Sequence, residues 1–168
     1  MKVIPREVES KNTKVCTWSR EIRALQKSLK LSKIQRELII GSILGDGCIA
    51  FNVHGKNCRF QVSQTAAQKS YVLWKRSIFD SWSLSEPFYN VKTNSWRFNT
   101  ISHPEFNLYH QIFYRDGKKI VPDDIDQLLV SALSVAIWFM DDGTRGPQHG
   151  YTLNTQNFSR EDNEKLMI

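Results

Sequence analysis

Two apolar segments of the chain each end in carboxylates, in "ELIIGSILGDGCI" (37–49) and "SVAIWFMDDGTR" (134–145). The first ends in Asp46 and the second in Asp141 and Asp142, and a glycine follows each. The C-terminal end of a helix is the negative pole of its macrodipole, which favours a cation by roughly 0.3 to 1 kcal/mol and disfavours a carboxylate. A single Asp-Gly is also typical of an ordinary turn. Two such ends, 96 positions apart, indicate a paired function.

The composition is that of one domain or of two small related halves, with 40% apolar residues among 168. No apolar stretch approaches the roughly 18 residues of a membrane span, and the N-terminus lacks the apolar core of a signal peptide. We therefore expect an intracellular protein, in a bacterial cytoplasm or in a mitochondrion or plastid, with no membrane partner. Cys16, Cys48 and Cys58 show no CxxC spacing, which argues against a disulfide framework or a zinc site.

The net charge of +6 is unevenly distributed. The first 36 residues hold ten Lys and Arg against three Glu. Two further stretches contain basic residues and no acid, five from 47 to 79 and two from 87 to 104. A surface that contacts phosphates requires such stretches. The alternative is that they are ordinary solvated faces of a sheet.

The order of the expected elements is helix, two strands, helix, two strands, helix. Ser32 and Gln35 form a capping box that begins the first of these helices, and a short helix around 19–29 precedes it. Alternating runs about Gly-containing or Asn-containing loops predict two hairpins. The predicted segments are a helix at 32–45, strands at 48–53 and 58–65, a helix at 67–82, strands at 87–93 and 95–102, a helix at 104–114, a turn at Asp116-Gly117 and a short helix at 123–129.

The pattern restarts after Val130. The apolar helix that ends in Asp142 is followed by the strand-like "YTLNTQNF" and by a helix capped by Ser159. The chain thus reads as an α+β unit, αββαββα, whose second copy is incomplete. We divide it into a basic N-terminal extension (1–31), a first half-domain (32–130) and a truncated second half-domain (131–168).

These segments resemble the LAGLIDADG homing endonucleases, specifically the single-chain type with two motifs. "IIGSILGDG" (39–47) matches the nine-residue motif at Gly41, Asp46 and Gly47, and "VAIWFMDDG" (135–143) matches at Ala136, Asp142 and Gly143. Apolar residues that end in Asp-Gly are common, so specificity comes from the accompanying segments. "FNTISHPEF", "GKKIVP", "WFMDDG" and "LNTQNFS" resemble family segments in order and spacing.

The resemblance implies two αββαββα halves whose motif helices pack together, with two curved sheets that form a saddle over duplex DNA. Gly41 and Gly45 are spaced i, i+4, as are Ala132 and Ala136, so each helix offers small residues for close approach, at roughly 8 Å between axes. The motif glycine of the second helix is replaced by Ile137, which predicts less symmetric packing.

Close approach of these helices brings two carboxylates together at two negative helix ends, which is repulsive unless a divalent cation lies between them. By resemblance, Asp46 and Asp142 are the metal-binding acids, with backbone groups near Gly45 and Asp141, and the cofactor is Mg²⁺. The Asp141 side chain is expected to have a structural or supporting role.

Lys119, the second lysine of "GKKIVP", resembles the active-site lysine of the family, which neutralises charge that develops on phosphate. The alternative is a solvated turn lysine, and Lys118 is the expected bystander. Several polar residues of the two hairpins alternate toward the expected DNA side, where Arg, Gln and Asn can contact base edges in the major groove. These DNA-binding candidates are Asn52, Lys56, Arg59, Gln61, Ser63, Lys92, Arg97 and Asn99.

The two copies differ in length. From Asp46 to Lys119 the first uses 73 residues, whereas 26 follow Asp142. We therefore expect the equivalents of the second hairpin, the next helix and Lys119 to be missing from the second copy. An incomplete copy leaves strand edges and apolar faces uncovered, so we expect association with a missing C-terminal segment or a second chain.

The sequence thus predicts a metal-dependent, site-specific endonuclease for double-stranded DNA, of the intron-homing or intein-homing type, although this chain alone could be an inactive fragment. The alternatives are an RNA-splicing maturase that binds its host intron RNA and a DNA-binding module that no longer cleaves. Asp46, Asp142 and Lys119 favour cleavage, because binding alone does not require acids beside phosphates.

Overall fold

A computed structural model describes residues 20–52, 55–146 and 150–167. Residues 1–19 of the predicted N-terminal extension lie outside this range. The described part contains a four-stranded antiparallel sheet, two two-stranded hairpins and the helices that pack against them. Among the described residues, no helix is both long and apolar enough to cross a lipid bilayer.

The first unit follows the predicted order, αββαββα, around a sheet with strand order β1-β2-β4-β3. The predicted short helix at 19–29 forms as α1 and precedes this unit. The elements are α1 (Arg20–Ser28), α2 (Lys33–Leu44), β1 (Cys48–Phe51), β2 (Cys58–Thr65), α3 (Lys69–Ile78), β3 (Phe88–Asn90), β4 (Ser95–Asn99) and α4 (Pro104–Phe113).

The start of α2 is set by the predicted capping box. The Ser32 side chain accepts from the Gln35 amide, and the Gln35 side chain accepts from the Ser32 amide. These bonds satisfy backbone donors that an α-helix leaves unpaired at its first turn. The turn between β3 and β4 contains Asn94 in the left-handed conformation, with φ of 47°, as suits an asparagine. Both predicted hairpins form. The strands of the second are shorter than predicted, because residues Val91–Thr93 form a 3-10 turn and β4 ends at Asn99.

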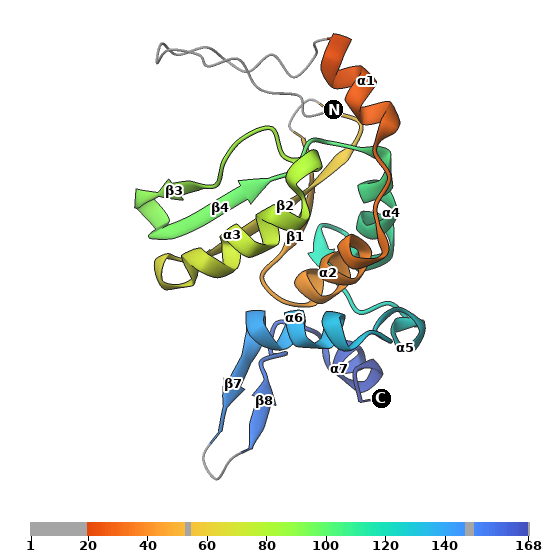
Figure 1. Ribbon diagram of the computed structural model, residues 1–168. Coiled ribbons are helices and arrows are strands. Elements are labelled where there is room, and N and C mark those ends of the chain that lie inside the picture. Colours follow the sequence, from red (N-terminus) through yellow and green to blue (C-terminus); the bar gives the residue numbers. More distant parts are fainter. Residues whose placement is uncertain (1–19, 53–54, 147–149, 168) are drawn as a thin grey trace.

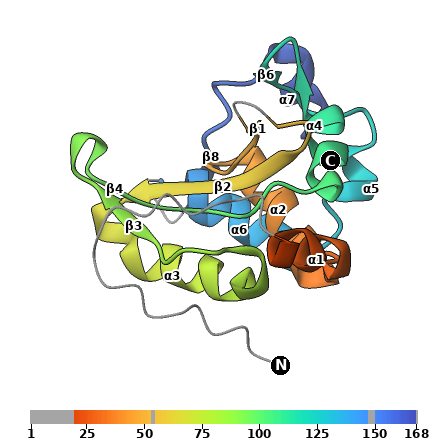
Figure 2. The same cartoon turned by 90° about the horizontal axis from the view of Figure 1, so that it is seen from above.

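One face of the sheet is buried under α3 and α4, and Figure 2 shows α3 running along it. Alternate residues of β2 point to this face, which places Phe60 and Val62 in the core. The Phe60 ring lies 5.2 Å from that of Phe79 and 6.3 Å from that of Phe98, between ring centroids. The period-2 alternation leaves the polar residues of the same strands on the opposite face.

The segment after α4 forms a short β-hairpin with a two-residue turn. Strands β5 (Tyr114–Arg115) and β6 (Lys118–Lys119) pair around Asp116 and Gly117, both of which have positive φ. Such a turn requires positive φ at its two central positions. A short helix, α5 (Ile125–Leu128), follows, as predicted.

The second unit contains α6 (Ala132–Asp142), β7 (Gly143–Arg145), β8 (Tyr151–Leu153) and α7 (Arg160–Lys165). The strand predicted from "YTLNTQNF" ends at Leu153, and Ser159 caps α7 as predicted. Helix α7 is attached to the segment after β6, because Asp162 accepts from the Val121 amide at 3.2 Å and Lys165 donates to the Val121 carbonyl at 3.0 Å.

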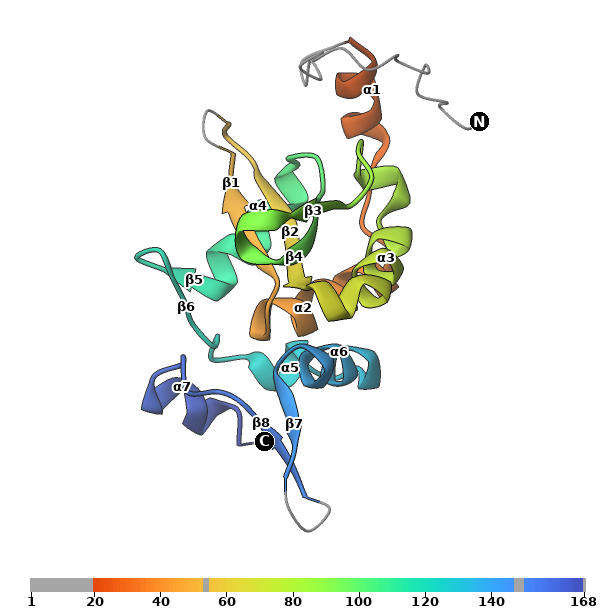
Figure 3. The same ribbon diagram turned by 90° about the vertical axis from the view of Figure 1, so that its left-hand side faces the viewer.

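Helices α2 and α6 pack side by side between the four-stranded sheet and the β7–β8 hairpin, as Figures 1 and 3 both show. A Cβ atom on Gly41 would lie 2.3 Å from the Ser134 carbonyl oxygen, and one on Gly45 would lie 2.4 Å from Cβ of Asp141. Both glycines are therefore contact points of the pair, which confirms the predicted close approach on α2.

The predicted small-residue stripe on α6 is wrong. Ala132 and Ala136 are exposed, and the buried side of α6 contains Ser134, Ile137 and Trp138. Ser134 fits because its hydroxyl donates to the Glu37 carbonyl of α2 at 2.9 Å. With Ile137 against Gly41, a large residue of one helix fills the space left by a small residue of the other, and the packing is asymmetric, as expected.

Candidate nucleic-acid cleavage site

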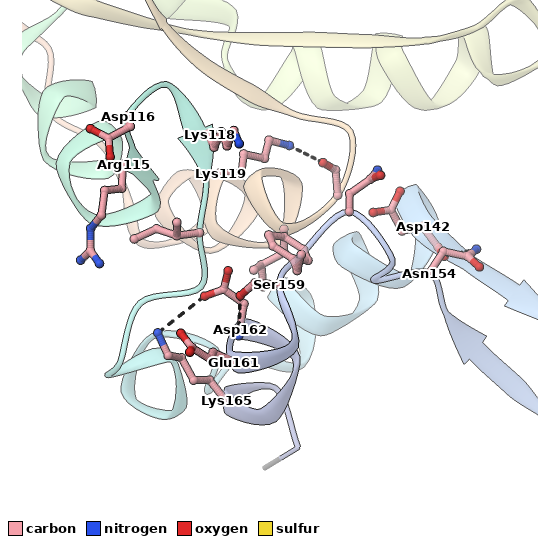
Figure 4. A pocket seen from close by; sticks show the side chains of 15 residues that line it. Arg115, Asp116, Lys118, Lys119, Asp142, Asn154, Ser159, Glu161, Asp162 and Lys165 are labelled. Carbon is pink, nitrogen blue, oxygen red and sulfur yellow. Dashed lines mark hydrogen bonds and ion pairs between the residues drawn. The ribbon is translucent and has the colours of Figure 1, made fainter.

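The C-terminal ends of α2 and α6 lie together, as predicted. Asp46 follows α2 and is exposed, whereas Asp142 is the last residue of α6 and is half-buried. Asp142 lines a cavity of about 820 Å³ together with Gly45 and Asn154. Figure 4 shows this cavity with Asp142 at one side. The Asp142 carbonyl accepts from the backbone amide of Asn154 at 2.9 Å and from its side chain at 2.7 Å, which fixes the end of the helix.

Lys119 reaches the same point from β6. Its Nζ donates to the Gly45 carbonyl at 2.6 Å, a bond that Figure 4 marks. Gly45 is the C-cap of α2, so the lysine ammonium lies at the C-terminal end of that helix. Lys118, its neighbour on the hairpin, is exposed and also lines the cavity. The structure therefore brings together Asp46, Asp142 and Lys119, which come from three separate elements.

The electrostatics of this site are those of acids held close together. Burial, and then the charges of Asp46 and Asp141, raise the pKa of Asp142 to about 6, and Lys119 and Lys75 oppose the shift. Burial lowers the pKa of Lys119, and Cys48 and then the neighbouring carboxylates oppose this shift. Nearby positive charge would favour the ionised form of Asp142.

The Asp141 side chain points away from this cavity and into the protein. Lys75 Nζ of α3 donates to its two carboxylate oxygens at 2.8 and 2.9 Å, and Gln64 of β2 donates to it at 3.0 Å. The same Nζ donates to Ser42 Oγ at 2.9 Å. The side chains of Lys75 and Asp141 have no solvent exposure. The pair therefore joins the end of α6 to α2, α3 and the sheet.

Burial opposes charge on both members of this pair. It lowers the pKa of Lys75 and raises the pKa of Asp141, and each group partly restores the charge of the other. Lys75 and Gln64 together donate three hydrogen bonds to Asp141, and Lys75 donates a further one to Ser42. These bonds satisfy the polar atoms that burial removes from water. Replacing one residue of such a network strongly destabilises the folded protein, because its partner then stays buried without a counter-charge.

Five of the DNA-binding candidates share the open face of the sheet, namely Arg59, Gln61, Ser63, Arg97 and Asn99. In the strand register Gln61 lies opposite Asn99, and Ser63 lies opposite Arg97. Arg59 is two residues before Gln61 on the same face, and its guanidinium donates to the Gln61 amide oxygen at 2.7 and 2.8 Å when that amide is oriented toward it. The other candidates lie at the ends of the hairpins. Asn52 and Lys56 are at the β1–β2 connection, and Lys92 is in the β3–β4 turn.

Two basic residues that were counted in the acid-free stretch 47–79 do not belong to this surface. Lys75 is buried with Asp141, and Arg76 is buried and bonds to Asp80 at 3.0 Å and to the Ser83 carbonyl at 3.1 Å. Both lie on the buried side of α3, whereas Lys69, at the start of the same helix, is exposed. The charge count along the sequence therefore overstated the basic character of the open face.

Sequence reasoning missed Lys75, Gln64 and Asn154. In the sequence, Lys75 is one of two adjacent cations in an otherwise amphipathic helix, and nothing marks it as buried. The presence of Asp141 beside Asp142 was the available signal, since a second carboxylate at a helix end requires a partner. Its partner came from an element 66 residues away in the sequence.

Similarity to known proteins identifies the family of the chain. The model of the LAGLIDADG DNA endonuclease family matches residues 36–168. The chain is 30% identical over 164 residues to the cytochrome b mRNA maturase bI2 of Debaryomyces hansenii, which covers 92% of this chain and 61% of that protein. It is 31% identical over 150 residues to a probable intron-encoded endonuclease 1 of Wickerhamomyces canadensis, which covers 82% and 64% respectively.

Among solved structures, the homing endonuclease I-WcaI bound to its DNA recognition sequence is similar, with a TM-score of 0.78 and 31% identity over 89% of this chain and 71% of that one. The chain therefore belongs to the LAGLIDADG DNA endonuclease family, as the motifs suggested. It spans less than two thirds of the length of the two curated relatives above.

The buried ion pair leads to a prediction about stability. Replacing Lys75 by Met should lower the free energy of unfolding by about 3 to 5 kcal/mol, because Asp141 then remains buried without its cation. The double variant Lys75→Met/Asp141→Leu should recover most of that loss. Urea denaturation of the single and double variants measures both values.

The control is the exposed pair Arg160–Glu164, whose N–O distance is 3.0 Å. Replacing both of its members by Gln should change stability by less than about 1 kcal/mol. A loss for Lys75→Met no larger than that of this surface pair would show that the Lys75–Asp141 pair does not hold the helix end.

Proposed function

We propose that this chain carries the cleavage site of a homing-type endonuclease that hydrolyses phosphodiester bonds in both strands of a specific DNA sequence. The observation that supports this most is the meeting of Asp46, Asp142 and Lys119 at the ends of α2, α6 and β6. A DNA-binding module that does not cleave would not need two acids where phosphates approach, since they repel the ligand.

The residues present fit a hard divalent cation. The available donors are the carboxylates of Asp46 and Asp142 and carbonyl oxygens at the helix ends, and Mg²⁺ binds oxygen ligands, often only one or two carboxylates together with substrate phosphates. Within the described ranges, no group of three or more His, Cys, Asp or Glu has the geometry of a metal site. The third nearby carboxylate, Asp141, is already bound by Lys75. Phosphate oxygens of the DNA would therefore complete the site.

We propose Asp46 and Asp142 as the residues that hold this cation, which when bound supplies Lewis acidity at the scissile phosphate. Lys119 contributes a positive charge that can shift from the Gly45 carbonyl to a phosphate oxygen, where it stabilises negative charge in the transition state. The open face of the sheet, with Arg59, Gln61 and Arg97, contacts base edges and phosphates and sets the register of the duplex.

A second candidate function is RNA splicing as a maturase. The similarity to the bI2 maturase over 92% of the chain favours it. The two functions differ in their ligand, because a maturase binds structured intron RNA and an endonuclease binds a duplex. Binding of each nucleic acid to the same preparation, in competition, decides between them. Preference for intron RNA over every duplex would favour the maturase.

The acids provide the first test of cleavage. In a preparation that cleaves a target selected from a randomised duplex library, Asp46→Asn or Asp142→Asn should abolish cutting of both strands in Mg²⁺. DNA affinity should stay within about tenfold, roughly 1.4 kcal/mol, because removing negative charge does not weaken phosphate contacts. Cleavage assays and titrations in Ca²⁺ measure the two effects.

Asp116→Asn is the matched control. Asp116 lines the same cavity but lies in the exposed β5–β6 turn, with a φ of 51° that asparagine also adopts. It should retain the wild-type rate. The assignment of the metal-binding acids is wrong if Asp142→Asn cuts both strands as fast as the wild type.

The two lysines of β6 test the role of Lys119. Lys119→Ala should slow single-turnover cleavage by about 10²-fold or more, the scale for loss of one preorganised electrostatic group, with little change in DNA affinity. Lys118→Ala removes the same charge one residue away and should have a much smaller effect. Equal effects from both substitutions would mean a general phosphate contact, and the catalytic role would be abandoned.

A further inference from the structure

Helix α1 is held in a defined position beside the first unit. Gln26 Nε2 donates to the Ser102 carbonyl at 2.9 Å, and the Gln26 carbonyl lies 2.9 Å from Nε2 of His103. Leu29, just after the helix, packs against the buried core. One side of the helix is thus attached to the loop between β4 and α4, and the opposite side faces solvent.

The solvent side carries a basic stripe, defined here as Arg20, Arg23 and Lys27, all exposed. Their spacing of three and four residues places them on one side of the helix. Lys30 continues the positive charge beyond the helix end, and Glu21 is the only acid within the nine residues of α1. Like charges at this spacing destabilise a helix slightly. Such a cluster therefore indicates an anionic partner.

The helix borders the open face of the sheet. Ile22 and Gln26 of α1 line a cavity of about 300 Å³ together with Asn52, Arg59 and Asn99, three of the candidates for DNA contact. Figures 1 and 3 show α1 at the end of the sheet where β1 connects to β2. Helix α1 therefore lies next to one end of the surface proposed to bind the duplex, and its basic stripe is on the side of the helix that faces solvent.

We propose that α1 extends this surface, and that its basic stripe binds the phosphates of duplex DNA that continues past the end of the sheet. The proposal rests on the proposed function, since it assumes a duplex on the open face. From Arg20 to Lys27 the helix rises about 10 Å, which corresponds to about three steps along the axis of a duplex. Contacts of this kind add affinity for any sequence and leave base recognition to the sheet.

Salt dependence of duplex binding tests the proposal. The double variant Arg23→Gln/Lys27→Gln removes two cations and keeps the helix, because Gln has a similar helix propensity. The slope of log affinity against log salt should fall by about two. Between about 50 and about 200 mM salt the variant should therefore lose roughly tenfold less affinity than the wild type, measured by fluorescence anisotropy with duplex of mixed sequence.

The matched control is Lys33→Gln/Arg160→Gln, which removes the same charge. The side chains of Lys33 and Arg160 are 87% and 92% exposed. Lys33 lies at the N-terminal end of α2, whereas Asp46 follows its C-terminal end. This variant should keep the wild-type slope. If the α1 variant has the slope of the control, the proposal fails while the proposed function stands. Loss of affinity for RNA alone would also overturn it. A wild-type chain that binds no duplex would instead contradict the proposed function.

Discussion

The close contact of α2 with α6 is the constraint on which the candidate site depends. Gly41 and Gly45 remove two side chains from α2, and the backbone and Cβ atoms of α6 occupy that space. Any side chain at either glycine would separate the helices. Since Asp46 and Asp142 lie at the ends of these two helices, the distance between the carboxylates follows from the packing several residues earlier.

Bringing acids together at helix ends is unfavourable, and the structure offsets it with cations from other elements. Lys75 neutralises Asp141 inside the protein, and Lys119 lies beside Asp46 and Asp142 at the surface. The two lysines thus divide the acids into a buried one that fixes the helix end and two accessible ones that remain for a ligand. The proposed cleavage depends on this division, because a metal ion needs carboxylates that no lysine already holds.

The sequence predicted the fold well because its signals are local. The capping box at Ser32, the alternation along β2 and the turn residue Asn94 each specify conformation within a few positions. The candidate site was predictable in part. The repeated Asp-Gly ends pointed to Asp46 and Asp142, the resemblance to family segments pointed to Lys119, and the structure brings the three residues close together.

The rest depends on contacts between distant segments, which periodicity does not show. Ala132 and Ala136 have the spacing of a contact stripe, yet α6 is rotated so that Ser134 and Ile137 face α2. The burial of Lys75 likewise follows from the position of α3 under the sheet. A cation in a charge count cannot be assigned to the surface or the interior until its helix has been placed.

Residue-level amide hydrogen exchange of α2 and α6 tests most directly whether this helix pair holds the site together. If the two helices form one packed unit, the amides of Ile137, Trp138 and Phe139 open only with those of Ile40 and Ile43, with free energies near that of global unfolding. Exchange in α6 that is orders of magnitude faster than in α2 would contradict the account, because Asp142 would then not be held against Asp46.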